Sequence, residues 1–226
     1  MNAPLVFVSG SKGGVGKSIT TMAVLDYLLT SNRYVKLLEA DTTNPDVWKS
    51  YARAVESEVV NLDGVDGWIH MVNCCDAEPQ TTFVVNTPAR NNDAVQEHGT
   101  ILMDSLQELG RPLVTLWVIN RQRDSLELLK TYLDTMTAGV VHVICNGYFG
   151  DARKFELYEQ SALKQVVQRQ GGMSLYLPDL ADRVTDALYT GRFTLDEAAK
   201  QLRLGDRAVL QSWRNSVREL LTQAVV

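Results

Sequence analysis

The stretch that most constrains the fold of this chain is residues 5–20, which read L-V-F-V-S-G-S-K-G-G-V-G-K-S-I-T. The apolar, β-branched run Leu5–Val8 predicts a buried strand, and a helical pattern begins near Lys17. Between them, glycines let backbone N–H groups converge on an anion, and the helix N-terminus adds partial positive charge. This order of strand, glycine loop and helix predicts a site for a nucleoside triphosphate.

The residue types in the loop match the chemistry of a polyphosphate with its metal. We expect Lys17 to reach the β and γ phosphates and the Ser18 hydroxyl to ligate Mg²⁺. Larger side chains at the glycines would obstruct the phosphates. The alternative, a glycine turn with two surface lysines, explains so specific a string less well. The loop residues expected to contact the nucleotide are Ser11, Lys12, Gly13, Gly14, Val15, Gly16, Lys17, Ser18 and Ile19.

The loop departs from the general phosphate-loop pattern at one residue and carries one additional lysine. Aligned on Gly16-Lys17-Ser18, that pattern requires glycine where this chain has Ser11, and Lys12 is an additional lysine. The string K-G-G-V-G-K-S resembles the deviant Walker A motif of the ParA/MinD family of ATPases. The resemblance extends over the whole chain, and within the family it looks closest to small plasmid-encoded members such as StbB and TraL.

The resemblance implies a mechanism as well as a fold. Its expected cofactors are ATP and Mg²⁺, and its expected active form is a homodimer that closes across two nucleotides and separates after hydrolysis. By the same resemblance, Lys12 would contact the nucleotide of the partner subunit, where its charge stabilises the leaving phosphate.

Two individual residues, each following a later predicted strand, resemble further functional residues of the family. Asp41, in E-A-D-T-T-N-P-D, resembles the aspartate that polarises the attacking water; Glu39 replaces the family's first aspartate. Asn86, in F-V-V-N-T-P-A-R, stands where the family has another aspartate; its amide can hold a metal-bound water but adds no charge. We expect slow hydrolysis, with Lys12, Lys17 and Asp41 catalytic and Ser18, Asp41 and Asn86 serving the metal. The alternatives are an acidic cap or loop at Asp41 and a plain strand end at Asn86.

Two segments in the second half resemble the family's base-binding elements. Asn146, in V-I-C-N-G-Y-F-G, follows a late strand, and Pro178-Asp179 follows another in L-Y-L-P-D-L. An asparagine side chain presents both a donor and an acceptor, which suits adenine N6 and N7. Each segment alone is also an ordinary turn. Together they favour ATP as the nucleotide.

Strand and helix patterns alternate along the chain without repeats or long linkers. This predicts an α/β fold: one P-loop NTPase domain over residues 1–226, with a mostly parallel sheet of seven or eight strands flanked by helices on both faces. The expected strands are 5–8, 34–38, 59–62, 81–85, 112–119, 140–144 and 174–177. The expected helices are 17–30, 45–54, 68–75, 92–109, 125–135 and 155–168, followed by a helical tail from Asp179 broken near Gly191 and Gly205.

Composition narrows the classes of protein that fit. The net charge of −5 argues against a whole-surface grip on DNA or anionic lipid, and no apolar run is long enough to span a bilayer. The start lacks a basic n-region, so we expect a cytoplasmic protein. The three cysteines, Cys74, Cys75 and Cys145, offer neither a disulfide framework nor metal-ligand spacing and are expected to be buried thiols.

The C-terminal helix carries Val209, Trp213, Val217 and Leu220 at helical spacing, with Arg207, Arg214 and Arg218 nearby. Such a stripe can bind a membrane, DNA or another protein, but packing against the sheet is the more common role. It lacks the short, strongly basic character of MinD-like membrane tails.

The sequence therefore favours an ATP-dependent dimerisation switch that positions or segregates a plasmid DNA–protein complex, with conjugation as a related role. The expected partner is a plasmid-encoded DNA-binding adaptor, and association with the nucleoid or cell pole would pass through it. Direct DNA contact stays open. So do three alternatives: a nucleotide-binding scaffold with negligible hydrolysis, a small-molecule kinase or synthetase, and a redox ATPase resembling the nitrogenase iron protein, whose cysteines are badly matched here.

Overall fold

The computed structural model describes residues 2–10, 12–89 and 91–225. Within them, seven strands form one sheet in the order β3-β2-β4-β1-β5-β6-β7, with every neighbouring pair parallel. This confirms the expected parallel α/β architecture with seven strands. The strands are β1 (Leu5–Ser9), β2 (Val35–Glu39), β3 (Glu56–Val59), β4 (Thr82–Asn86), β5 (Leu113–Ile119), β6 (Val140–Asn146) and β7 (Ser174–Leu177).

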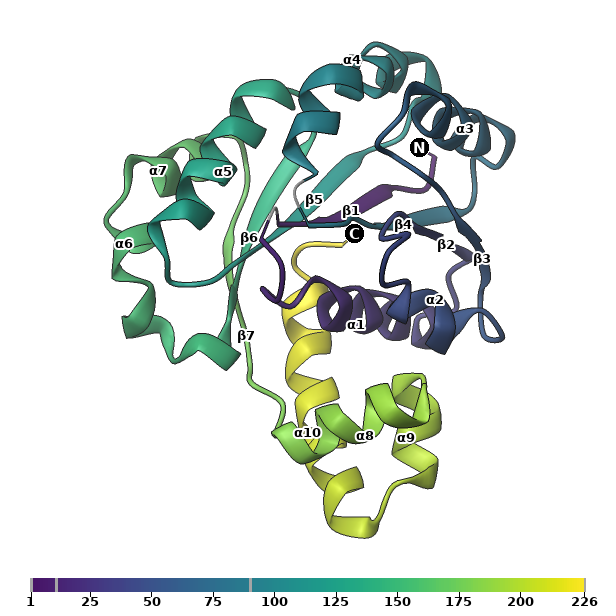
Figure 1. Ribbon diagram of the computed structural model, residues 1–226, viewed down its shortest axis with the longest axis vertical. Coiled ribbons are helices and arrows are strands. Elements are labelled where there is room, and N and C mark those ends of the chain that lie inside the picture. Colours follow the sequence, from purple (N-terminus) through teal and green to yellow (C-terminus); the bar gives the residue numbers. More distant parts are fainter. Residues whose placement is uncertain (1, 11, 90, 226) are drawn as a thin grey trace.

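Helices cover both faces of the sheet (Figure 1). One face carries α1 (Lys17–Thr30), α2 (Asp46–Tyr51), α8 (Asp182–Gly191), α9 (Leu195–Gln201) and α10 (Leu204–Leu221). The other carries α3 (Val65–Ala77), α4 (Asn92–Leu109), α5 (Arg123–Thr135), α6 (Glu156–Glu159) and α7 (Ala162–Arg169). Two short 3₁₀ segments, η1 (Gly147–Phe149) and η2 (Ala152–Phe155), follow β6. Among the described helices, none has the length and apolarity needed to cross a bilayer.

Strand β1 lies at the centre of the sheet and is buried on both sides. Val6 and Val8 belong to the core under α1, whereas Leu5 and Phe7 belong to the core under α3 and α4. This double burial explains why β1 reads as a continuous apolar run rather than an alternating one. Because its neighbours β4 and β5 are parallel to it, their carboxyl ends meet at the glycine loop.

The strand expected at 59–62 lies at Glu56–Val59 instead. β3 is an edge strand paired with β2, and its polar residues Glu56 and Glu58 make side-chain contacts with Lys36 and His70. The apolar pattern from Val59 was misleading because the residues after the strand are also buried, where the chain crosses toward α3. An edge strand need not be apolar, since one of its long sides faces solvent.

The helix expected at 155–168 is also wrong in detail. It consists of η2, α6 and α7, interrupted at Gln160–Ser161, where the Ser161 hydroxyl accepts a hydrogen bond from the N–H of Lys164 and begins a new helix. The tail begins at Asp182 rather than Asp179, and its second break precedes Gly205, which lies inside α10. Serine competes for backbone donors, so it caps a helix more readily than it continues one.

Helix α10 packs against the rest of the domain, as the commoner role of an apolar stripe predicts. Its buried face consists of Leu210, Trp213, Arg214, Val217 and Leu221. Val209 lies outside that face and is 45% exposed, so the expected stripe was rotated by about one residue. The Trp213 indole N–H donates to the carbonyl of Pro178 at 2.7 Å, and Arg214 forms a bidentate ion pair with Asp26 of α1 at 2.9 and 2.7 Å.

We predict that the Arg214–Asp26 pair is a strong stability determinant. Asp26→Ala leaves a buried guanidinium without its partner and should cost about 3–5 kcal/mol of unfolding free energy, measured by urea denaturation. Asp134→Ala, which breaks the exposed Lys130–Asp134 pair, is the matched control and should change nothing measurable. The joint change of Asp26→Leu and Arg214→Met should cost less than Asp26→Ala; an equal or larger cost would contradict the charge argument.

Candidate nucleotide-binding site

The loop between β1 and α1 adopts a conformation that requires glycine. Gly16 caps α1 with φ +105°, and a Cβ there would lie 2.2 Å from Nδ2 of Asn146. At Gly13, by contrast, an added Cβ would meet only the Ala89 Cβ at 4.0 Å, so the folded chain itself does not require glycine there. Ser11, expected to contact the nucleotide, lies outside the described residues.

Lys17 is the most constrained charge at the loop. Its side chain is buried, and its ammonium donates to the carbonyls of Gly10 at 2.9 Å and Lys12 at 3.0 Å. Burial lowers the pKa of Lys17 to about 8, and the Asp41 carboxylate partly offsets that effect. A cation held by neutral carbonyls in a partly desolvated place is favourably placed to receive an anion.

The start of α1 is suited to an anion as well. Among the described residues, α1 has no side-chain cap and no acid in its first turn. Its first N–H groups therefore point out of the helix next to Lys17, with the positive end of the helix dipole behind them. Ser18 and Ile19 lie at this end and are half-buried, and their contacts with the metal and the nucleotide stay predictions.

A buried hydrogen-bond chain links α1 to two strands beneath the loop. The Thr21 hydroxyl donates to Oδ1 of Asn86 at 2.9 Å, and Nδ2 of Asn86 donates to Oε1 of Glu39 at 2.7 Å. Glu39 is fully buried and also accepts the N–H groups of Asp41 at 3.1 Å and Trp48 at 3.2 Å. Burial raises the pKa of Glu39 to about 7, against the opposing effect of these hydrogen bonds.

These hydrogen bonds change the interpretation of Asn86. Both polar atoms of its amide already have protein partners, so Asn86 links α1 to β2 beneath the loop. The two strands are in register here, with Glu39 opposite Asn86, which explains why the carboxylate and the amide meet. A role for Asn86 at the metal stays a prediction, and an added carboxylate at this position would face Glu39 at hydrogen-bond distance.

Asp41 lies at the predicted place beside the loop. It is half-buried, and its charge acts on Lys17. Its Oδ1 accepts the N–H of Asn44 at 2.9 Å, so the carboxylate also shapes its own loop. Asp41 therefore stabilises its own loop rather than capping α2, whose N-cap is Pro45, and its role in catalysis stays a prediction.

Lys12 lies on the opposite side of the loop from Asn146. Its ammonium contacts Oδ2 of Asp124 at 2.6 Å and Oε1 of Gln122 at 3.0 Å, both at the start of α5. It borders a cavity of about 660 Å³ whose other lining residues include Gly13, Asn120 and Phe149. Sequence reasoning did not identify Asp124 and Gln122, because nothing in their local pattern marks them as partners of Lys12.

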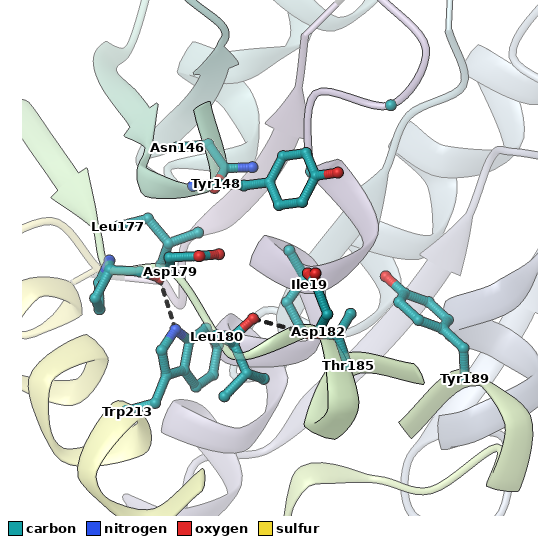
Figure 2. A pocket seen from close by; sticks show the side chains of 13 residues that line it. Ile19, Asn146, Tyr148, Leu177, Asp179, Leu180, Asp182, Thr185, Tyr189 and Trp213 are labelled. Atoms are coloured by element: carbon teal, nitrogen blue, oxygen red, sulfur yellow. Dashed lines mark hydrogen bonds between the residues drawn. The ribbon is translucent and has the colours of Figure 1, made fainter. Parts of the chain in front are cut away.

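A second cavity, of about 170 Å³, lies on the other side of the loop (Figure 2). Asn146 and Tyr148 line one wall, and Ile19, Asp179 and Tyr189 line others. This brings the predicted residues Ile19, Asn146, Pro178 and Asp179 together at one pocket next to Gly14 and Gly16. The exposed ring of Tyr148 at its rim was missed from the sequence, although N-G-Y-F-G was singled out.

Asn146 and Pro178 also hold the pocket together. Nδ2 of Asn146 donates to the Val15 carbonyl at 2.7 Å, and its Oδ1 accepts the N–H of Tyr148 at 3.1 Å. The Pro178 carbonyl accepts the Trp213 indole. Thus the phosphate loop, the residues after β6 and the residues after β7 are joined by direct hydrogen bonds.

Comparison with known proteins identifies a close relative. The chain is 51% identical over 221 residues to Protein MobD of Acidithiobacillus ferrooxidans, covering 98% of this chain and 97% of the relative. The chain belongs to the MobD family. None of the protein-family models searched matches it.

Solved structures show that this MobD-family chain shares the fold of MinD. The MinD cell division protein of Aquifex aeolicus superposes with a TM-score of 0.58 at 14% identity, covering 97% of each chain. MinD of Pyrococcus horikoshii, complexed with Mg-ADP, gives 0.57 at 13% identity and covers 99% of this chain and all of the other. The resemblance to the ParA/MinD type is thus confirmed at the level of fold, while a closer link to StbB and TraL is a matter for proposal.

The buried Glu39 of this MobD-family chain should make the stability of the fold depend on pH. Its pKa is raised from 4.5 to about 7, so the folded protein keeps a proton between these values that the unfolded chain releases. Stability should therefore fall as pH rises from about 5 to about 8, by up to about 3 kcal/mol from this group. Urea denaturation of wild type and Glu39→Gln across this range isolates the effect, because the variant should lose that part of the slope.

The control for this experiment is Glu127→Gln, which alters an exposed carboxylate paired with Arg123 and should keep the wild-type slope. If Glu39→Gln and wild type share the same pH slope, Glu39 does not titrate in this window.

Proposed function

We propose that this chain binds Mg-ATP, hydrolyses it slowly, and uses it to control dimerisation in the handling of a plasmid DNA–protein complex during transfer or partition. The observation that carries the nucleotide site is the buried ammonium of Lys17, held by two carbonyls of its own loop at the start of α1. A bound polyphosphate would replace weak dipole partners with full negative charge, which is the strongest partner an ammonium can have.

Within this proposal, several of the predicted residues take specific chemical roles. Lys17 and the first N–H groups of α1 bind the phosphates, and Ser18 offers its hydroxyl to Mg²⁺, which the site would need to neutralise phosphate charge. Asp41 is the carboxylate that would orient the attacking water and accept its proton. The cavity lined by Asn146 and Asp179 is where the base would lie, with the exposed Tyr148 ring available to stack on it.

We predict that Lys17→Ala loses nucleotide affinity. Removing a charge-assisted phosphate contact from a desolvated site should cost about 2–4 kcal/mol of binding or transition-state free energy. Isothermal titration with ATP, ADP and GTP in the presence of Mg²⁺ measures this and also tests the preference for adenine. Lys49→Ala, which removes an exposed lysine of α2, is the matched control and should bind like wild type.

Equal ATP affinity and turnover in Lys17→Ala and wild type would remove the basis for the site. Circular dichroism of both variants establishes that any loss is not a loss of fold.

The switch part of the proposal rests on Lys12. In the single chain its ammonium is held by Asp124 and Gln122, at the border of the larger cavity. Lys17 already serves the phosphates of its own subunit, so Lys12 is available to a nucleotide bound by a second subunit once it leaves Asp124. This would couple ATP binding to association, because the contact exists only in the dimer.

We predict that Lys12→Ala binds Mg-ATP with near-normal affinity but fails to form an ATP-dependent dimer. Light scattering with a slowly hydrolysed ATP analogue measures the dimer, and phosphate release measures turnover, which should fall together with it. Asp124→Asn, which frees Lys12, should dimerise at least as well as wild type. Lys130→Ala, a lysine of α5 paired with Asp134, is the control. Normal dimerisation and turnover in Lys12→Ala would refute the switch.

A nucleotide-binding scaffold with negligible hydrolysis is the second candidate, and Asn86 is the observation that favours it. Both polar atoms of its amide already have a protein partner, Thr21 or Glu39, and an amide brings no charge toward a metal. Phosphate release with and without a plasmid-encoded DNA-binding adaptor separates the two: release stimulated by the adaptor supports the switch. We place this activity in the bacterial cytoplasm. Within the ParA/MinD type, we group the chain with small plasmid-encoded proteins such as StbB and TraL.

A further inference from the structure

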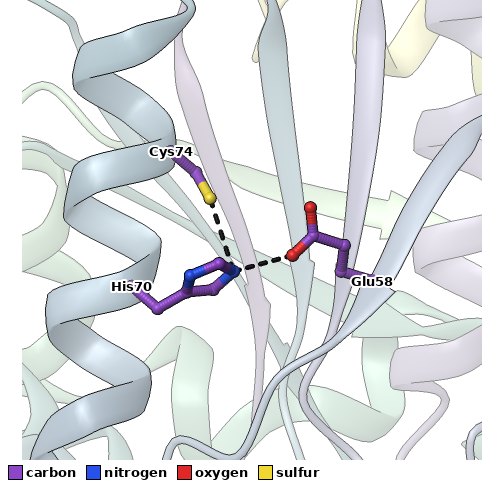
Figure 3. Close-up of side chains that lie close together, drawn as sticks. All are labelled: Glu58, His70 and Cys74. Atoms are coloured by element: carbon purple, nitrogen blue, oxygen red, sulfur yellow. Dashed lines mark hydrogen bonds and ion pairs between the residues drawn. The ribbon is translucent and has the colours of Figure 1, made fainter.

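Outside the nucleotide site, three metal-ligating side chains of different chemistry converge near the β3 edge of the sheet (Figure 3). Glu58 extends from β3, and His70 and Cys74 extend toward it from α3. Nε2 of His70 lies 2.7 Å from Oε2 of Glu58 and 3.5 Å from Sγ of Cys74. All three ligand atoms lie within 4.8 Å of one another. We propose that this cluster binds a Zn²⁺-class transition-metal ion.

The placement follows from helix and sheet geometry. His70 and Cys74 are four residues apart in α3, so they lie on consecutive turns of the same helix face. The Glu58 side chain lies on the face of β3 that is directed toward α3. Glu56, two residues earlier, lies on the same face and pairs with Lys36. The donors therefore come from two elements that pack against one another, and the fold rather than a local loop brings them together.

The distances fit a tetrahedral ion with little movement. With ordinary Zn–S and Zn–N bond lengths, the sulfur and the ring nitrogen would be about 3.6 Å apart, close to the 3.5 Å observed. The nitrogen and the carboxylate oxygen would be about 3.4 Å apart, so the Glu58 carboxylate must withdraw by about 0.7 Å from its present 2.7 Å. Its side chain is 41% exposed, which gives it the room to do so.

Hydrogen bonding alone does not account well for this arrangement. Both contacts meet at the same ring nitrogen, which carries at most one proton and can direct it well at only one partner. A cation at the centre would satisfy the nitrogen, the sulfur and the carboxylate together. A nitrogen, a thiolate and a carboxylate form a borderline ligand set, typical of Zn²⁺ and unlike the all-oxygen sets of Mg²⁺.

The accessibility of the cluster suits metal entry. The His70 side chain is 51% exposed and Cys74 is half-buried, whereas the neighbouring Cys75 is 1% exposed and faces the core. Three protein ligands with one side open to solvent leave a fourth position for water. Coordination takes Cys74 as its thiolate, so its thiol proton passes to solvent as the S–metal bond forms. The expectation of buried thiols is confirmed for Cys75 and Cys145, whereas Cys74 is half-buried and, in this proposal, ligates the metal.

Titration of untagged, nucleotide-free protein with Co²⁺ tests the proposal, because a Co²⁺–thiolate bond has a characteristic charge-transfer absorption. We expect one Co²⁺ per chain with this band, displaced by Zn²⁺ and not by Mg²⁺. Cys74→Ser should abolish the band. His70→Ala and Glu58→Gln should each weaken Zn²⁺ binding at least about tenfold. Loss of a residue that only hydrogen-bonds to a ligand already weakens metal affinity by about 10–100-fold, so loss of a ligand should cost no less. Wild type should also unfold at a higher temperature with Zn²⁺, and Cys74→Ser should not.

The matched controls keep the surroundings and change residues outside the cluster. Glu56→Gln alters the neighbouring acid on the same strand, and His98→Ala removes a histidine of α4; both should bind as wild type does. Absence of a thiolate band in wild type, survival of the band in Cys74→Ser, or equal Zn²⁺ affinity across the cluster variants would overturn the proposal. Because the assay contains no nucleotide, its outcome is independent of the phosphate loop.

Discussion

The hydrogen-bond chain from Thr21 through Asn86 to Glu39 is the interaction on which the organisation of the nucleotide-proximal edge depends. It joins the helix that follows the phosphate loop to two adjacent strands, and Glu39 extends it to the backbone of Asp41. The side chains of Thr21, Asn86 and Glu39 are all buried, so removing one would leave a neighbour unsatisfied at a cost of roughly 1–3 kcal/mol. The loop, the catalytic candidate Asp41 and the lysine beside it therefore keep their relative positions through one polar network.

The sequence predicted those parts of the fold and site that depend on local pattern. The loop, the helix that follows it and the parallel sheet were predictable because glycine positions and apolar periodicity have direct conformational consequences. The edge strand was misplaced by three residues because its polarity depends on what lies beside it in the sheet. The role of Asn86 was not predictable either, since its two partners are separated from it by 65 and 47 residues.

The same dependence on distant residues explains why the cluster of Glu58, His70 and Cys74 was not predicted from the sequence. Counting cysteines and their spacings examines one residue type along the chain, whereas this set combines three types from a strand and a helix. Parallel pairing of β3 with β2 and packing of α3 over that face bring them together. Partners of Lys12 were invisible for the same reason, because Asp124 is 112 residues away.

Helix α10 constrains how two distant parts of the chain can move. The Trp213 indole donates to the Pro178 carbonyl, and the next residue, Arg214, pairs with Asp26 of α1, the helix that begins at Lys17. Two consecutive residues of α10 thus contact two separate elements, the segment that follows β7 and helix α1. Because the two contacts are one residue apart on a single helix, α1 and the segment after β7 cannot move relative to each other without disturbing one of them.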